Sequence, residues 1–155
     1  MKKYLTKIVL FFGIVAVLGP YFVSAHTIPT PLLLFPGAAV GCFYVGVLNV
    51  NNIRDMETDA PNRVTVAIRL GERRAKIYQS VLIALGWILM TLWCMMRIHD
   101  PWHYLYVLTL PLYILHLRGV WHRTGRELDP MLPLLVISTF LFCLLGGLGF
   151  VIYLF

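Results

Sequence analysis

The sequence predicts an all-α protein, a polytopic bundle of membrane helices that forms a single domain over residues 1–155. Composition is the first reason: 59% of the residues are hydrophobic, only 13% are charged, and the mean hydropathy is +0.79. Soluble domains carry about 25% charged residues. The second reason is that the apolar residues gather in long stretches, and no repeat or long linker divides the chain.

Five apolar stretches are long enough, or nearly so, to cross a hydrocarbon core, which requires about 20 helical residues. Apolar residues occupy nearly all sides of each stretch, as expected for helices surrounded by lipid or by other helices. The fourth is the shortest and needs its flanking aromatic residues to reach both interfaces. The five predicted transmembrane helices span residues 8–25, 32–50, 77–96, 102–117 and 131–155.

The basic residues alternate between the two sides of this predicted bundle. Three precede the first helix, the loop 26–31 has none, and the loop 51–76 has six. One follows the third helix, and three precede the fifth. Lys and Arg are enriched in cytoplasmic loops. We therefore expect a protein of the cell (inner) membrane, with its N-terminus and the loop 51–76 in the cytoplasm and its C-terminus outside. The lipid bilayer accounts for the net charge of +6 without a nucleic-acid partner.

Residues 1–25 allow a second interpretation, as a cleaved secretory signal peptide. They have a basic start, an apolar stretch and small residues at Ser24 and Ala25. The apolar stretch is about 16–18 residues long, which is long for a signal peptide, and Gly19 and Pro20 interrupt it. The sequence therefore favours a retained helix.

The most concentrated chemical signal is a polar run where the second helix ends, at residues 49–59. A proline two residues after Asp59 disfavours helical geometry in the residue before it, so we expect the helix to stop near Asp59. On a helix, Asn51, Asp55 and Asp59 recur at every fourth residue and form one stripe. Asn52 lies beside this stripe.

Acidic residues in this position are unfavourable without a partner. Asp55 and Asp59 repel each other, and a helix C-terminus already carries partial negative charge. A magnesium ion would offset both effects, because it takes hard oxygen ligands and is usually completed by water and substrate phosphates. The adjoining basic loop suits the same polyanion. The residues alone thus predict a site for a metal-bound phosphate or diphosphate. An ordinary solvated loop of mixed charge is the alternative that the spacing leaves open.

Two longer runs carry a family resemblance: NNIRDMETD at 51–59 and TVAIRLG at 65–71. The first resembles the second aspartate-rich motif of the UbiA superfamily of intramembrane prenyltransferases. The double asparagine and the second run point to the branch of 1,4-dihydroxy-2-naphthoate polyprenyltransferases of menaquinone synthesis. The run ELDPML at 127–132 also resembles the segment before the last helix in that branch.

The resemblance implies a nine-helix bundle in which two aspartate-rich motifs face a central cavity that is open to the cytoplasm. There, Mg²⁺ joins the acids to a prenyl diphosphate, and loss of diphosphate generates an allylic carbocation that the aromatic acceptor attacks. By resemblance, Asp55 and Asp59 are the catalytic metal ligands. The resemblance also assigns the substrate diphosphate to four residues, one of which replaces a lysine of the family: Asn51, Asn52, Arg63 and Arg69.

The chain departs from the family in length. Its five predicted helices resemble the last five of nine, and no second acid-rich stripe replaces the first motif. We therefore expect a C-terminal portion that holds half of the metal site, lacks transferase activity alone and has the missing N-terminal half as a partner. The alternative is a non-enzymatic membrane subunit or inactive remnant that packs through glycines, such as Gly37, Gly41, Gly146 and Gly147. A small transporter is a third possibility, but it would place its acids at mid-bilayer, whereas the acids of this chain are predicted at the membrane interface.

Overall fold

A computed structural model describes residues 15–26, 31–97 and 101–153 of the chain, and each regular element in these ranges is a helix. This confirms the predicted all-α class. Elements labelled η are 3₁₀ helices. In chain order the elements are α2 (Ala16–Ala25), η2 (Pro31–Leu33), α3 (Leu34–Arg54), α4 (Met56–Asp59), α5 (Val66–Leu70), α6 (Glu72–Arg97), η3 (Pro101–Thr109), α7 (Leu110–His122), η4 (Gly125–Leu128) and α8 (Met131–Tyr153).

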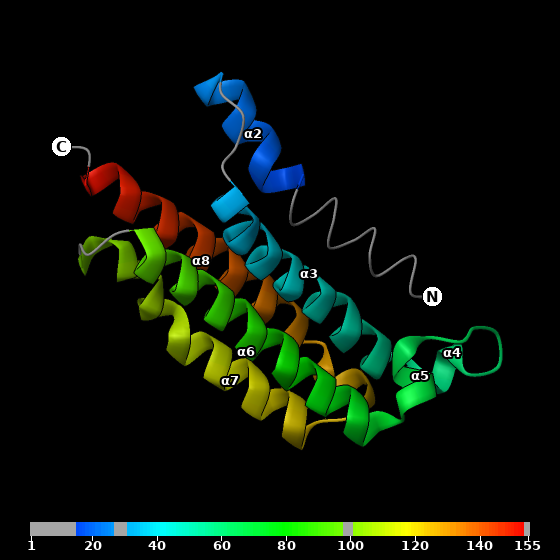
Figure 1. Cartoon of the computed structure of the whole chain (residues 1–155). Helices are drawn as coiled ribbons and strands as arrows, with labels where there is room; N and C mark the ends of the chain where they lie inside the picture. The colour runs from blue at the N-terminus through cyan, green and yellow to red at the C-terminus, as the bar shows by residue number, and fades with distance from the viewer. Residues whose placement is uncertain (1–14, 27–30, 98–100, 154–155) are drawn as a thin grey trace.

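The long helices α3, α6 and α8 and the stretch formed by η3 and α7 lie side by side and alternate in direction (Figure 1). α3 packs along α6, η3 continues into α7, and α8 packs against η3, α7 and α3. The short helices α4 and α5 lie together at the end of the bundle where α3 finishes and α6 begins, and α2 lies at the opposite end (Figure 1). We call the end that carries α4, α5 and η4 the polar end.

The turn from α5 into α6 follows from two local features of the sequence. Thr65 caps α5, because its Oγ1 accepts a hydrogen bond from the backbone N–H of Ile68 at 3.3 Å. Gly71 ends α5 with a φ of +76°, a conformation that costs glycine little. The apolar pattern predicted a start at residue 77, but α6 already starts at Glu72. The earlier start is stable because Lys76 pairs with Glu72 at 2.6 Å, one turn away.

Three helical stretches in the described ranges are long and apolar enough to cross a membrane: Pro31–Arg54, Glu72–Met96 and Gly125–Gly149. They correspond to the second, third and fifth predicted helices. The predicted helix 102–117 is formed by η3 and α7, which begin with nine residues of 3₁₀ helix. Residues 16–25 of the predicted helix 8–25 form α2 and residues 8–14 lie outside the described ranges, so the count of five stays a prediction.

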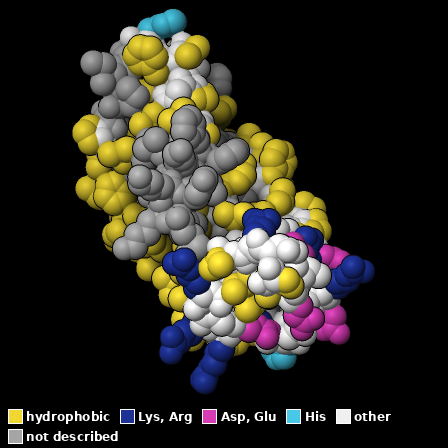
Figure 2. Space-filling view, turned by 90° about the vertical axis from the view of Figure 1, so that its right-hand side faces the viewer, with side chains coloured by type: hydrophobic (Ala, Val, Ile, Leu, Met, Phe, Trp, Pro, Cys, Tyr) yellow, Lys and Arg dark blue, Asp and Glu magenta, His cyan; other side chains and the backbone are white. Residues whose placement is uncertain are grey.

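The bundle has an aromatic interior and an apolar exterior. Five rings from α3, α6, η3, α7 and α8 contact one another inside it, namely Phe43, Trp87, Tyr106, Tyr113 and Phe142. Large apolar side chains such as Ile88, Leu115 and Phe140 are more than half exposed on the outside. Figure 2 shows apolar side chains over the long body and charged ones gathered at the polar end. A surface of this kind belongs in lipid, and the chain is an integral membrane protein.

A buried chain of hydrogen bonds ties the four long helices together. The amide nitrogen Nδ2 of Asn49 donates to the carbonyl oxygen of Ala75 and to Oε1 of Gln79, both at 3.0 Å. Nε2 of Gln79 lies 3.1 Å from Nε2 of His116, and Nδ1 of His116 lies 3.0 Å from the carbonyl oxygen of Met131. The histidine therefore accepts from Gln79 and donates to Met131. Sequence reasoning did not anticipate this network.

Candidate functional site

The predicted stripe of polar residues lies at the polar end, where α3 runs into α4. The backbone N–H of Asp55 donates to the carbonyl oxygen of Asn51 at 3.0 Å, and that of Asp59 donates to Asp55 at 2.8 Å. These consecutive bonds keep the three residues in helical register, although Asp55 itself departs slightly from helical geometry. α4 ends at Asp59, as predicted.

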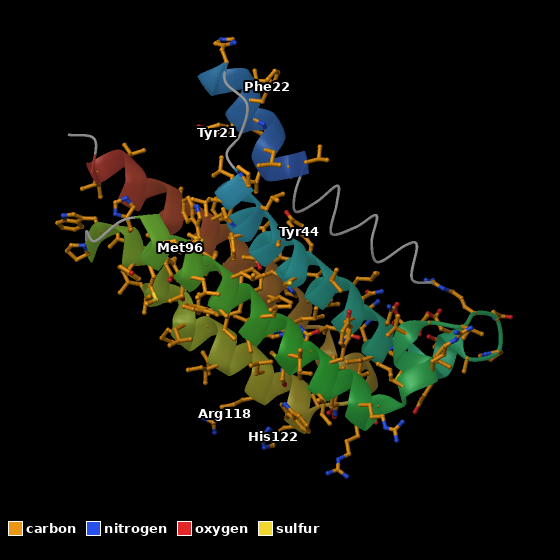
Figure 3. The ribbon with its side chains drawn as sticks, viewed as in Figure 1. Tyr21, Phe22, Tyr44, Met96, Arg118 and His122 are labelled. Atoms are coloured by element: carbon orange, nitrogen blue, oxygen red, sulfur yellow. The ribbon has the colours of Figure 1, made fainter. Side chains whose placement is uncertain are left out.

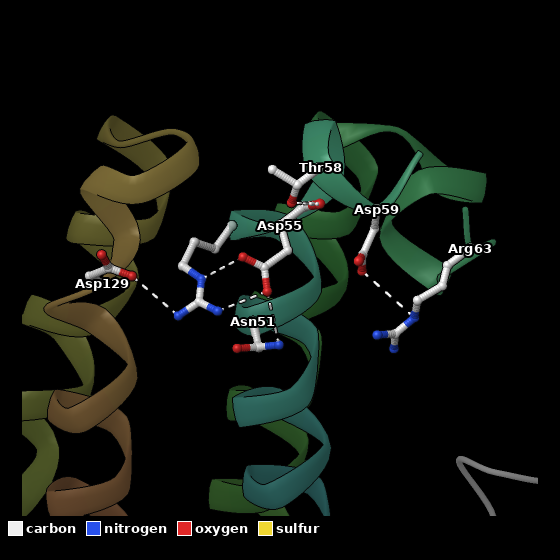
Figure 4. A network of polar contacts seen from close by, with 7 residues as sticks. Asn51, Asp55, Thr58, Asp59, Arg63 and Asp129 are labelled. Carbon is white, nitrogen blue, oxygen red and sulfur yellow. Dashed lines mark hydrogen bonds and ion pairs between the residues drawn. The ribbon is translucent and has the colours of Figure 1, made fainter. Parts of the chain in front are cut away.

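The carboxylate of Asp55 is held by three hydrogen bonds (Figure 4). Arg54 donates from Nε to Oδ1 at 2.7 Å and from Nη2 to Oδ2 at 2.8 Å, and Nδ2 of Asn51 donates to Oδ2 at 3.3 Å. Hydrogen bonding to the Arg54 guanidinium lowers the pKa of Asp55, against a smaller opposing effect of burial. Asp55 is therefore an anion at neutral pH, which is the form that binds a cation.

The carboxylate of Asp59 turns to a different arginine. Its Oδ2 lies 3.8 Å from Nε of Arg63, whose side chain is 64% exposed. Figure 4 shows the carboxylates of Asp55 and Asp59 pointing to different sides, each toward its own arginine. The backbone carbonyl of Asp59 also accepts from the N–H groups of Asn62 and Arg63, which closes the turn after α4. One helical turn thus separates two acids that are each paired with a cation.

The other two residues assigned to the diphosphate occupy different surroundings. Asn52 is buried on another side of α3, where it lines a small hollow of about 10 Å³ together with Asn49, Val66 and Tyr78. Arg69 is exposed on α5. In the described part of the chain, the structure joins Asn51 to Asp55 and Arg63 to Asp59, and it does not join Asn52 or Arg69 to either acid.

An apolar hollow of about 250 Å³ lies between α3 and α8. It is lined from α8 by Val136, Thr139, Phe140 and Cys143. From α3 it is lined by Val40, Tyr44 and Val47, which precede Asn51 and Asp55 at steps of three or four residues. Residues at this spacing share one face of a helix. Tyr44 points outward from α3 in Figure 3. One face of α3 therefore passes from an apolar groove to the polar stripe.

The donor set fits a magnesium ion in part. Within the described ranges, no group of three or more His, Cys, Asp or Glu side chains is placed to hold a metal. Magnesium, however, is often held by one or two carboxylates, with water and substrate phosphate oxygens as the other ligands. Asp55 and Asp59 are of that chemical type and lie one turn apart. Arg54 occupies both oxygens of Asp55 in this structure.

Sequence reasoning missed the role of Arg54 in joining two parts of the chain. Its Nη1 donates to Oδ1 of Asp129 at 3.2 Å, so one guanidinium bridges α3 and the connection from α7 to α8 (Figure 4). Asp129 follows η4, which itself packs on α3. The sequence offers one signal for this contact, the opposite charges of Arg54 and Asp129 in the two runs that resemble the prenyltransferase family. The two residues lie far apart along the chain, so their opposite charges alone do not predict the contact.

Comparisons with known proteins agree with these motifs. Residues 7–140 match the UbiA prenyltransferase family. Among similar proteins, the 1,4-dihydroxy-2-naphthoate octaprenyltransferase of Escherichia coli is 35% identical over 126 residues, which are 81% of this chain and 39% of that protein. The proteins of the same name from Haemophilus influenzae and Mycobacterium tuberculosis are 31% and 35% identical, over 94% and 79% of this chain.

The chain spans less than half the length of these relatives, between 39% and 48% in the three cases. No solved structure matches the chain. The matched region includes the polar stripe at the end of α3. It also includes the α3 residues that line the hollow and most of the α8 residues that line it.

Proposed function

The chain belongs to the UbiA prenyltransferase family, and from that premise we propose that it is part of a magnesium-dependent enzyme of menaquinone biosynthesis. This enzyme transfers a polyprenyl group from prenyl diphosphate to 1,4-dihydroxy-2-naphthoate, the acceptor in the names of the relatives. One observation carries the proposal. A single face of α3 changes from an apolar groove at Val40, Tyr44 and Val47 to the anionic and amide groups of Asn51 and Asp55.

That face matches the shape of a prenyl diphosphate, which has a long apolar chain and a highly charged head. From residue 40 to residue 55 a helix rises about 22 Å, enough for several isoprene units beside the head group. The apolar chain gains free energy by leaving water. The diphosphate stays at the polar end, where arginines and the aqueous phase can stabilise its charge.

Each polar residue has a role in this proposal. Asp55 and Asp59 hold the metal, Asn51 orients Asp55, and Asn52 supports the end of α3 from its buried side. Arg63 and Arg69 contact the diphosphate oxygens. Bound at these carboxylates, Mg²⁺ would supply positive charge that stabilises the departing diphosphate. The exposed position of both arginines allows them to move toward a bound head group.

The chain supplies only part of such a site. Its two acids leave several metal positions to be filled by water, by phosphate and by residues outside this chain. We propose that the missing N-terminal half of a UbiA-type enzyme supplies a second acidic motif opposite Asp55. The N-terminus and the polar end lie on the cytoplasmic side of the cell membrane, and the C-terminus lies outside, in keeping with the distribution of Lys and Arg.

Reconstitution tests the proposal. The chain is expressed alone and together with the part of the E. coli relative that it does not match, and each preparation receives octaprenyl diphosphate, dihydroxynaphthoate and Mg²⁺. We expect prenylated naphthoate only from the combined preparation, and none after EDTA. The Asp55→Ala variant should abolish turnover, because the metal loses its central ligand.

Glu57→Ala is the matched control, since it removes an exposed acidic side chain two residues after Asp55. It should keep most of the activity. Turnover by the chain alone would contradict the division into two halves. Full activity of the Asp55→Ala variant, at equal protein level, would contradict the metal site. A combined preparation that assembles but stays inactive would favour a non-enzymatic subunit.

A further inference from the structure

Arg54 is shared between two carboxylates that come from distant parts of the chain. Two of its nitrogens bind Asp55 at 2.7 and 2.8 Å, and the third binds Asp129 at 3.2 Å. The Arg54 and Asp55 side chains are 26% and 30% exposed, and Asp129 is 59% exposed. The shorter, two-point contact is therefore also the one more shielded from water.

We propose that Arg54 and Asp129 are positioning residues that set how readily Asp55 takes a divalent cation. Arg54 is a counter-ion built into the chain, which neutralises Asp55 until a metal arrives. Asp129 gives Arg54 a second partner when it leaves. This inference rests on the proposed metal role of Asp55 and goes beyond it, because it assigns functions to two residues outside the acid stripe.

Competition for the same oxygens is the first step of the argument. Arg54 donates to both Oδ1 and Oδ2 of Asp55, and Asn51 adds a third bond to Oδ2. A metal ion that binds either of these oxygens brings positive charge close to the guanidinium, so it competes with Arg54 for the carboxylate. Without Arg54, the acid would keep only the bond from Asn51 and would lie without this counter-ion at a helix C-terminus, where negative charge is unfavourable.

The second step concerns where Arg54 goes. A cation released beside a newly bound metal ion would be repelled by it, which would weaken metal binding. Asp129 already holds Nη1 of Arg54, so the guanidinium can stay on Asp129 while it leaves Asp55. Asp129 is held near α3 because its backbone N–H donates to the carbonyl oxygen of Arg126 at 3.0 Å at the end of η4, and η4 packs on α3. The acid on the α7–α8 connection therefore draws Arg54 away from Asp55.

Binding of Mn²⁺, a paramagnetic substitute for Mg²⁺, tests this directly on the purified chain in detergent. Loss of the electron paramagnetic resonance signal of free Mn²⁺ reports binding without any need for turnover. We expect Arg54→Gln to raise the affinity about two- to fivefold, the range that a partly exposed ion pair is worth. Asp129→Asn should lower it by a similar factor, because Arg54 then binds Asp55 alone.

The double variant separates the proposed mechanism from a simple effect of charge. If Asp129 acts through Arg54, then Arg54→Gln with Asp129→Asn should bind Mn²⁺ as tightly as Arg54→Gln alone. If Asp129 acts only by its negative field, its loss should weaken binding equally in both backgrounds, and the proposal is overturned. Arg126→Gln controls for net charge. Arg126 attracts Asp55 electrostatically from farther away, so its loss should raise the affinity less than Arg54→Gln does.

Further outcomes distinguish failure of this inference from failure of the proposed function. An Asp55→Asn variant that binds Mn²⁺ as well as the wild type would remove the metal role of Asp55, and both proposals fall. If Asp55→Asn weakens binding but Arg54→Gln does not strengthen it, only the role of Arg54 falls. Arg54→Lys is the substitute variant if Arg54→Gln proves unstable. It keeps the charge and loses the two-point contact, so it should also bind Mn²⁺ more tightly than the wild type.

Discussion

Nδ2 of Asn49 lies 3.0 Å from Oε1 of Gln79, and Asn49 therefore lies on the face of α3 that looks into the bundle. Gln79 is fully buried and passes the connection on to His116. Asn49 precedes Asn51 by two residues and Asp55 by six, so a helical turn of 3.6 residues directs it to a different face. With Asn49 held inside the bundle, Asn51 and Asp55 lie on the face of α3 that also lines the apolar hollow.

Replacing Gln79 with Leu should destabilise the bundle. The substitution leaves Nδ2 of Asn49 with one acceptor and Nε2 of His116 without a donor. Hydrogen bonds between membrane helices contribute about 0.6 kcal/mol on average and up to about 1.7 kcal/mol, so we expect a loss of roughly 1 kcal/mol. Thermal unfolding in detergent measures it. The double variant with Asn49→Leu should cost less than the sum of the two single variants, and strictly additive costs would contradict a shared network.

The stabilising effect of Arg54 on Asp55 should disappear in acid. The pKa of Asp55 lies below its ordinary value of 3.8 because Arg54 stabilises the anion. The contact therefore contributes stability above that ordinary value and loses it as the pH falls through the lowered pKa. The unfolding midpoint of Arg54→Gln should lie below that of the wild type at pH 7 and at pH 5. The gap, worth at most about 1 kcal/mol, should close below about pH 4. A gap of equal size at pH 3 would refute this.

Two neighbouring glycines of α8 should respond in opposite ways to alanine. A Cβ at Gly149 would collide with the backbone carbonyl oxygen of Trp102, which cannot move without shifting η3. A Cβ at Gly147 would meet no atom within 4 Å. Gly149→Ala should lower the unfolding midpoint, whereas Gly147→Ala should raise stability by about 0.5–1 kcal/mol through helix propensity alone. Equal midpoints for the two variants would argue against the close contact of α8 with η3.

The orientation of the chain can be read from the labelling of single cysteines. The Glu57→Cys and His26→Cys variants are prepared without the native cysteines, Cys42, Cys94 and Cys143. Both positions are exposed, and they lie at opposite ends of the bundle. A membrane-impermeant maleimide should label the His26→Cys variant in intact spheroplasts, and the Glu57→Cys variant only after permeabilisation. The reverse pattern would invert the predicted topology.

The register of the polar stripe was predictable, but the partners of its acids were not. Helical spacing alone placed Asn51, Asp55 and Asp59 at successive turns. The predicted end near Asp59 is correct, but Ala60 keeps helical backbone angles before the proline at 61, so the proline does not act through the geometry of Ala60 as expected. The pairing of Asp55 with Arg54 and of Asp59 with Arg63 depends on side-chain rotation, which the sequence does not specify. The two carboxylates consequently point to different sides, although they belong to one stripe.

Local physics also explains the errors in the helix boundaries. Hydropathy predicted a start at residue 77 for the helix that begins at Glu72, because apolar periodicity gives no weight to a charged first turn that Lys76 stabilises. The predicted helix 102–117 begins as a 3₁₀ helix packed on α8, and tertiary contact overrides its local pattern.

By itself, the sequence determined the membrane environment, the helical class and the acid stripe, because these depend on composition and on spacing within a few residues. Only the tertiary structure decided that Arg54 meets Asp129, 75 positions away, and that Asn49 meets Gln79 and Gln79 meets His116, 30 and 37 positions away. Such contacts depend on the rotation of each helix about its axis and on its depth against its neighbours. Those are set by the packing of all four helices together, so no single segment encodes them.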